Sequence, residues 1–133
     1  MSKFKNIEYH LETKKTRNEY DFYMDYKDGG HGEIWTKIEP FGFIEKNNKY
    51  TKQLCINLCE FQPHNWQSPK TPCDKTRQRK GFGEHILNKI IQIIRKSESV
   101  NIIITRATTI EMKHFVEKHN WKKIQQYHYK YIS

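Results

Sequence analysis

The spacing of the apolar residues changes at Gly83, and this change constrains the fold more than any other feature of the chain. Before it, apolar and polar residues alternate over long stretches, as is typical of strands. After it, apolar residues repeat with the spacing of one helix face, up to an expected helix end near Lys96. The stripe consists of Leu87, Ile90, Ile91 and Ile94, widened by Ile86 and Ile93.

Two hairpins are predicted in the part before Gly83. The first places alternating residues of 20–26 and 34–38 on either side of Asp28-Gly29-Gly30, because glycine supplies the positive φ of a tight turn. The second spans 41–61, with Asn47-Asn48 near its tip. Both faces of its return strand are expected to be covered. One face would carry Leu54, Ile56 and Leu58, and the other Cys55, Cys59 and Phe61.

The segments around these hairpins are expected to be simpler. Residues 4–9 predict a strand, and ETKKTRNE (12–19) predicts a polar connection to the first hairpin. Residues 62–76 hold three prolines and little periodicity, so we expect a long loop there.

After the first helix, the run VNIIIT (100–105) predicts a buried strand. A second helix is expected to begin at Thr108 as N-cap, because Glu111 follows at the spacing of a capping box. Asn120 suits the left-handed end of that helix, and WKKIQQYHYKYI predicts one long or two short strands. The residues expected to be buried on this helix are Met112, Phe115, Val116 and His119.

Length and composition favour one globular, cytoplasmic domain covering 1–133. No apolar run of about 18 residues is present that would predict a membrane span, and MSKFKNIEYH lacks the apolar core of a secretion signal. The cysteines, Cys55, Cys59 and Cys73, are odd in number. We therefore expect free thiols rather than a disulfide framework.

The net charge of +9 lies in one part of the chain. Residues 1–74 hold 11 Lys/Arg against 11 Asp/Glu, whereas residues 75–133 hold 13 against 4. A basic surface attracts any phosphate-bearing ligand. Charge alone therefore leaves both a nucleotide-like cofactor and nucleic acid open.

The basic run before the first helix predicts a phosphate site. The N–H groups of a helix's first turn have no partners within the helix, and the helix dipole adds positive potential there. Gly81 and Gly83 permit positive φ and a close approach of main chain to ligand, while Arg77, Arg79 and Lys80 add charge. Neither a Walker loop nor a dinucleotide fingerprint is present.

The segment QRKGFG, Gln78 to Gly83, matches the pattern [QR]-x-x-G-x-[GA], the pyrophosphate loop of the GNAT family of N-acetyltransferases. FVEKHNWKKI, beginning at Phe115, resembles the family's F-Y-E-K-x-G-F segment and follows in the correct order. The resemblance covers about residues 41–132 and is strong over 77–124. It is much more specific than either motif alone.

This resemblance implies a fold and a cofactor. The fold would be mixed α/β, a mostly antiparallel central sheet with splayed parallel strands and flanking helices, the splayed pair being 53–61 and 100–105. Acetyl-CoA would bind in the opening between them, without a metal ion. N–H groups of residues 79–84 would hold its pyrophosphate, with Phe82 facing inward. The implied cofactor-binding residues are Gln78, Arg79, Lys80, Gly81, Phe82, Gly83 and Glu84.

The implied reaction transfers the acetyl group to an acceptor amine by direct attack on the thioester. An amine with a pKa of about 10.4 is mostly protonated at neutral pH, so a base must remove a proton. Glu60, at the end of the first splayed strand, and His64, just beyond it, are the candidates. The acceptor itself, a small molecule or a protein, is left open.

The sequence departs from the family pattern in several places. Val116 stands where the family often has a tyrosine acid, and Asn120 replaces its glycine. The loop 62–76 is longer than usual. Residues 10–31 show no helical stripe where the family has two helices over the acceptor, so we expect an open acceptor site.

Metal-site alternatives have weaker support. His31-Gly32-Glu33 with Pro72-Cys73 is similar to the elements of zinc deaminases, but Thr76 stands where their second cysteine is required. A structural zinc site would draw on the three cysteines and His64, but CINLC is not a knuckle spacing.

The main alternative is a GNAT-like binding protein without catalysis that contacts nucleic acid through its basic C-terminal half. Aromatic residues among basic ones can stack on bases, although alternating strand aromatics usually pack a sheet. No motif for nucleic acid binding is present. The aromatic residues concerned are Trp66, Trp121, Tyr127, Tyr129 and Tyr131.

Overall fold

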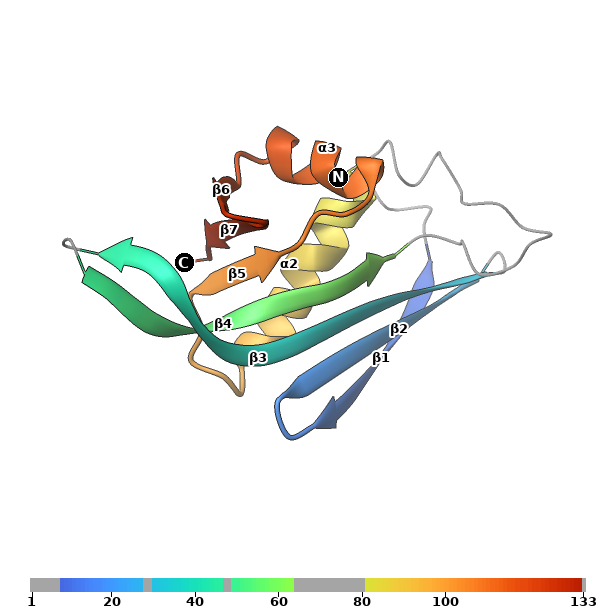
Figure 1. Cartoon of the computed structure of the whole chain (residues 1–133). Helices are drawn as coiled ribbons and strands as arrows, with labels where there is room; N and C mark the ends of the chain where they lie inside the picture. Colours follow the sequence, from blue (N-terminus) through green and yellow to red (C-terminus); the bar gives the residue numbers. More distant parts are fainter. Residues whose placement is uncertain (1–7, 28–29, 47–48, 64–80, 133) are drawn as a thin grey trace.

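A seven-stranded sheet with two helices makes up the described part of the chain (Figure 1). The computed structural model describes residues 8–27, 30–46, 49–63 and 81–132. The strand order is β1-β2-β3-β4-β5-β7-β6, and only the β4–β5 pair is parallel. The elements are β1 (Tyr9–Thr16), β2 (Glu19–Tyr26), β3 (His31–Lys46), β4 (Lys49–Gln62), α2 (Phe82–Arg95), β5 (Ile102–Thr105), α3 (Ile110–Lys118), β6 (Lys122–Ile124) and β7 (Tyr127–Tyr131).

Both predicted hairpins are present. Alternate residues of β2 are buried from Tyr20 to Tyr26, and those of β3 are buried at Ile34, Thr36 and Ile38. Gly30 has a φ of 95°, and its carbonyl accepts a hydrogen bond from the Tyr26 N–H at 3.1 Å. Residues 28–29 of the first turn and 47–48 of the second tip lie outside the described residues.

The prediction of a polar connection at 12–19 was wrong. Most of that segment lies in β1, whose eight residues pair with β2. Main-chain pairing needs no apolar side chain, and the lysines of this edge strand lie over β2 rings. The Lys14 Nζ is 5.1 Å from the Tyr23 ring centre, and the Lys15 Nζ is 5.3 Å from that of Tyr20. Of the predicted strand 4–9, residues 4–7 are outside the described part.

The face assigned to Phe61 was also wrong. In the β3–β4 register, Trp35 pairs with Glu60 but Thr36 pairs with Leu58, so Cys59 is an extra residue in a β-bulge. The extra residue reverses the alternation. Phe61 therefore packs with the cluster that holds Ile56 and Leu58, while Cys55 lies in the cluster on the other face.

Both helices pack on the same face of the sheet. The core on that face contains the α2 stripe, Val116 of α3 and strand residues such as Phe22 and Ile34. The cluster on the opposite face contains only strand residues: Phe41, Cys55, Ile102 and Ile104, with Ile124, Tyr127 and Tyr129 against it. No helix in the described ranges is long and apolar enough to cross a membrane.

The ends of the helices agree with the predictions to within one or two residues. α2 ends at Arg95, and Asn120 has a φ of 60°. The N-cap of α3 is Thr109 rather than Thr108, because the Thr109 hydroxyl accepts the Met112 N–H at 3.1 Å. The C-terminal segment forms two short strands. The predicted loop 62–76 lies outside the described residues from 64 onward.

Candidate active site

The parallel pairing of β4 with β5 is short and ends at Leu58 and Thr105. The Thr105 hydroxyl, in a side chain only 3% exposed, donates to the Leu58 carbonyl at 3.1 Å. Beyond that point β4 continues to Gln62 and stays paired with β3 on its other side. β5 ends at Thr105, and in the described part of the chain no strand pairs with this edge of β4 beyond Leu58. The chain after β5 turns away from β4 toward α3 (Figure 1), and we call this opening the divergence of β4 and β5.

The N-terminus of α2 faces this divergence. Its N-cap, Gly81, has left-handed backbone angles (φ 75°, ψ 18°), a conformation that only glycine adopts without strain. The first helical hydrogen bond runs from the His85 N–H to the Gly81 carbonyl at 3.2 Å. The N–H groups of Gly83 and Glu84 precede it and have no acceptor within the helix. As a glycine, Gly81 has no side chain that could cap this end of α2.

A cavity of about 240 Å³ lies between the start of α2, the end of β4 and α3. Its walls include Gly81, Gly83, Phe61 and Phe115. The rings of Phe61 and Phe115 are 5.5 Å apart. A Cβ added at Gly83 would meet those rings at 3.5 to 3.8 Å, in ordinary contact, and would take up space inside the cavity. The remaining walls come from α3: Thr109, Glu111, Met112, His114, Lys118 and His119, together with Glu84 of α2.

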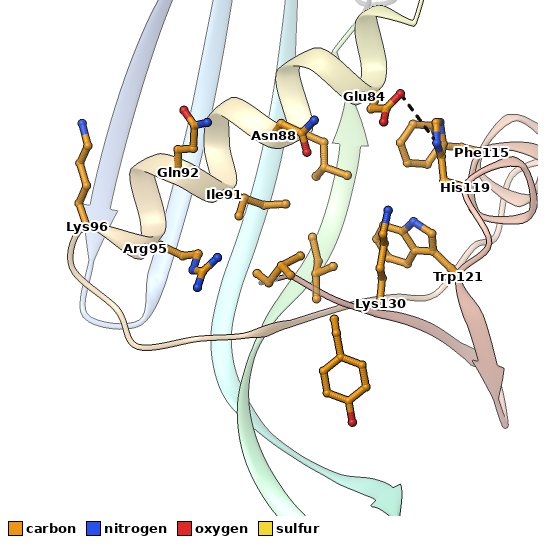
Figure 2. A pocket seen from close by; sticks show the side chains of 14 residues that line it. Glu84, Asn88, Ile91, Gln92, Arg95, Lys96, Phe115, His119, Trp121 and Lys130 are labelled. Atoms are coloured by element: carbon orange, nitrogen blue, oxygen red, sulfur yellow. Dashed lines mark ion pairs between the residues drawn. The ribbon is translucent and has the colours of Figure 1, made fainter.

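A larger groove of about 610 Å³ lies next to the cavity, along α2 (Figure 2). Glu84, Phe115 and His119 line both spaces. The Glu84 carboxylate lies 3.8 Å from the His119 ring, whose other contact is Phe115 at 4.6 Å between ring centres. Trp121 and Lys130 line the groove near Phe115 and His119, and Arg95 and Lys96 line its far part (Figure 2). The two spaces therefore share a wall, and the groove carries positive charge at its far end.

Of the two candidate bases, the structure describes Glu60 but not His64. Glu60 is half-buried near the end of β4, and the Gln62 amide donates a hydrogen bond to its carboxylate. Because Glu60 pairs with Trp35 while Phe61 pairs with Ile34, Glu60 points to the face opposite the helices. Glu60 lies two residues beyond Leu58, on the edge of β4 with which no described strand pairs. His64 lies outside the described residues.

Of the predicted cofactor-binding residues, Gly81, Phe82, Gly83 and Glu84 are described, and Gln78, Arg79 and Lys80 are not. Phe82 is fully buried, as the resemblance implied. The sequence reasoning missed Phe61 and Phe115 as cavity walls. For Phe115 a sequence signal was present, because it belongs to the matched FVEKHNW segment. The bulge at Cys59, which turns Phe61 toward the cavity, has no such signal.

The cysteines of the described part do not form a site. Cys55 and Cys59 are free thiols, Cys55 buried and Cys59 exposed. Burial, together with the charge of Glu39, raises the pKa of Cys55 to about 12, so its thiol stays protonated at neutral pH. In the described ranges no group of three or more His, Cys, Asp or Glu could hold a metal ion. Cys73 lies outside them.

Comparison with known proteins identifies the fold. No family model matches the chain, and no curated protein matches it in sequence. Solved structures do match. The KacTA complex with DNA has a TM-score of 0.58 at 12% identity over 88% of this chain and 70% of that one. A tyrosine-to-phenylalanine mutant of KacT has a TM-score of 0.59 at 12% identity, over 85% and 71%.

A third match is a tyrosine mutant of the AtaT toxin, bound to the C-terminus of the antitoxin AtaR and to acetyl-CoA. Its TM-score is 0.56 at 9% identity, over 84% of this chain and 67% of that one. These neighbours have the GNAT fold, so this chain has a GNAT-like fold, a mixed α/β sheet with a splayed parallel pair. At such low identities the comparison shows the fold alone.

Proposed function

We propose that the protein is an N-acetyltransferase that transfers an acetyl group from acetyl-CoA to an amine. The observation that carries this proposal is the cavity at the N-terminus of α2, which opens beside the divergence of β4 and β5. The N–H groups of Gly83 and Glu84 suit a pyrophosphate, because helix N-termini attract anions. The acetyl-CoA bound to AtaT, a protein of the same fold, supports the same cofactor here.

The residues of the cavity suit a ligand of this shape. Gly83 leaves open the space that a Cβ would occupy, and Phe61 and Phe115 provide an apolar wall beyond it. Main-chain groups of Cys59 and Glu60, on the edge of β4 with which no described strand pairs, can pair with the amide-containing arm of the cofactor. When bound, acetyl-CoA supplies an activated acetyl thioester at this edge.

Glu60 is the base in this proposal. The acceptor nitrogen forms a bond to the acetyl carbon, the carbon–sulfur bond breaks, and the Glu60 carboxylate takes the proton that the nitrogen loses, directly or through water. The CoA sulfur leaves as a thiolate and takes up a proton from solvent. Val116, at the family's tyrosine position, is fully buried in the core and donates no proton.

Calorimetry and mass spectrometry test the proposal together. Acetyl-CoA should bind the purified protein with a stoichiometry of one, and incubation of a cell extract with protein and isotope-labelled acetyl-CoA should label an amine.

Glu60→Gln should keep cofactor affinity and lower transfer by about 10²- to 10⁴-fold, the usual contribution of a general base. Absence of acetyl-CoA binding by the wild-type protein would refute the proposal.

A second candidate function is nucleic acid binding. The groove beside α2 favours it, because Arg95, Lys96, Lys130 and Trp121 line this groove. KacTA, of the same fold, has also been solved with DNA. A titration with an oligonucleotide at several salt concentrations tests it. Binding that weakens steeply with salt would support this candidate, and binding absent even at low salt would exclude it.

A protein partner is a further proposal. It is supported by AtaT, which is bound to the C-terminus of its antitoxin. Co-purification of the tagged chain from its native cells tests whether a partner exists.

A further inference from the structure

Strands β2, β3 and β4 have a face that no described helix covers. All buried helix residues belong to the core on the other side, and α2 lies behind these strands in Figure 1. We call this surface the open face. By register, it includes Glu19, Asp21, Tyr23, Asp25, His31, Glu33, Trp35, Lys37, Glu39, Asn57 and Glu60.

The open face is strongly acidic. It carries six carboxylates, those of Glu19, Asp21, Asp25, Glu33, Glu39 and Glu60, against the single ammonium of Lys37. The neighbouring strand β1 adds Glu12 and Lys14 opposite Tyr23 and Asp21, one charge of each sign. The surface therefore has an excess of negative charge, although residues 1–74 as a whole are neutral.

Shifts in pKa on this face are consistent with a negative potential. Burial and the charge of Glu19 raise the pKa of Asp21, against the opposing effect of Lys14. Burial raises the pKa of Tyr23, and the charges of Asp21, Glu33 and Glu12 add to the effect. Cations near this face would relieve the repulsion between its carboxylates.

An exposed tryptophan lies among these carboxylates. Trp35 is 43% exposed and pairs in register with Asp21 on one side and with Glu60 on the other. An indole face flanked by carboxylates is favourable for Lys and Arg side chains, because it offers cation–π contact beside ion pairs. The same surface repels a phosphate backbone. Residues 75–133, which hold both helices, carry the net charge of +9.

We propose that the open face docks a Lys/Arg-rich segment of a polypeptide acceptor, whose amine reaches the opening between β4 and β5 beside Glu60. The inference rests on the proposed acetyltransferase function and names the class of its acceptor. Glu60 belongs both to the open face and to the diverging end of β4, so a segment lying on Trp35 has its neighbouring amine at the base.

The test compares two labelled peptides of equal length, one containing several lysines and one in which all but the acceptor lysine are glutamate. Binding is measured by fluorescence anisotropy and acetyl transfer by mass spectrometry. The variant Asp21→Asn/Glu33→Gln removes two charges from the open face. The control Glu98→Gln/Glu117→Gln removes two charges elsewhere. The amide oxygen that this control introduces at position 98 can still accept the hydrogen bond that Tyr20 donates to Glu98 at 3.0 Å.

The lysine-rich peptide should bind the wild-type protein at least tenfold more tightly than the glutamate-rich one. Asp21→Asn/Glu33→Gln should weaken that binding about five- to tenfold, and the control less than twofold. Equal binding of the two peptides, or equal effects of the two variants, would overturn the inference. Equal acetyl transfer to both peptides would refute the proposed docking surface but would agree with the proposed acetyltransferase function. Tighter binding of the lysine-rich peptide without any acetyl transfer would support the proposed docking surface but would refute the proposed acetyltransferase function.

Discussion

At the scale of single residues, a substitution at Gly83 shows whether the start of α2 binds a cofactor or is only a structural turn. Replacing Gly83 by alanine places a methyl group in ordinary contact with Phe61 and Phe115. Alanine is better than glycine inside a helix by about 0.5–1 kcal/mol, so the free energy of unfolding should stay the same or rise. Acetyl-CoA affinity should nevertheless fall at least tenfold, because the methyl group occupies the cavity.

Calorimetry and urea unfolding of Gly83→Ala measure the two effects. Gln92→Ala, an exposed change later in α2, is the control and should leave the cofactor affinity within about twofold of wild type. Unchanged affinity in folded Gly83→Ala would exclude the cavity as the cofactor site. Gly81 is a less suitable position, because any side chain there is strained at a φ of 75°.

The raised pKa of the Cys55 thiol predicts how the free energy of unfolding changes at alkaline pH. Its thiol has a pKa of about 12 in the folded protein against 9.0 for a freely exposed cysteine. A raised folded-state pKa contributes stability that is complete below pH 9 and is lost as the pH rises toward 12, since the unfolded chain ionises first. Between pH 8 and pH 10, wild type should lose about 1 kcal/mol more unfolding free energy than Cys55→Ala.

Urea unfolding of both proteins at the two pH values measures this difference. The other titrating groups are common to both proteins and cancel in the comparison. An equal loss in the two proteins would show that the Cys55 thiol ionises as readily in the folded chain as in the unfolded one.

At the scale of elements, the approach of β3 to the end of β4 depends on Gly32. A Cβ at Gly32 would lie 2.6 Å from the Pro63 main chain and 2.7 Å from the Gln62 carbonyl oxygen. The end of β4, which carries Glu60 and Phe61, would have to move. We expect Gly32→Ala to lower the free energy of unfolding by about 1–3 kcal/mol, the usual cost of overpacking.

Chemical denaturation of Gly32→Ala beside Gly83→Ala measures this cost, because the second variant adds the same methyl group without a clash. If both variants unfold at the wild-type denaturant concentration, the end of β4 is not held against Gly32.

The start of α3 gives a second prediction at this scale. Thr109→Ala should cost about 1 kcal/mol of unfolding free energy, because the Met112 N–H loses the hydroxyl that accepts it. Thr108→Ala should cost almost nothing, and it is a matched control one residue away. Thermal or urea unfolding distinguishes the two, and the reverse order would restore Thr108 as the cap.

The elements that sequence predicted were those whose side chains show a period. The hairpins of β2–β3 and β3–β4 and helix α2 each have one, and strand β5 was predicted instead from a continuous apolar run. β1 was missed because its pairing is made by the main chain, with polar side chains at the sheet edge. The β-bulge at Cys59 was missed because it arises from the pairing of β4 with β3, which no local pattern records.

Like the fold, the candidate site was predictable only where a local sequence pattern exists. Gly81 and Phe82 follow from a contiguous motif, and the structure gives them the expected conformation and burial. Phe61 and Phe115 meet only because a strand and a helix far apart in the sequence pack together. Such contacts depend on the whole fold.

At the scale of the molecule, charge and topology divide the protein into two sides. The sequence predicted that positive charge lies in residues 75–133, but it did not predict that β2 and β3 carry an acidic face away from the helices. The divergence of β4 and β5 lies between these sides. In this account a phosphate-bearing cofactor enters from the helix side and a cationic acceptor from the other.

The position of bound acetyl-CoA is measured by titrating the isotope-labelled protein with acetyl-CoA and following its amide signals in nuclear magnetic resonance spectra. The account predicts large shifts for the amides of Gly83 and Glu84 at the start of α2 and for residues 59–62 of β4. It predicts little change in β1 and β6. Shifts confined to other regions, or none at saturating acetyl-CoA, would contradict it.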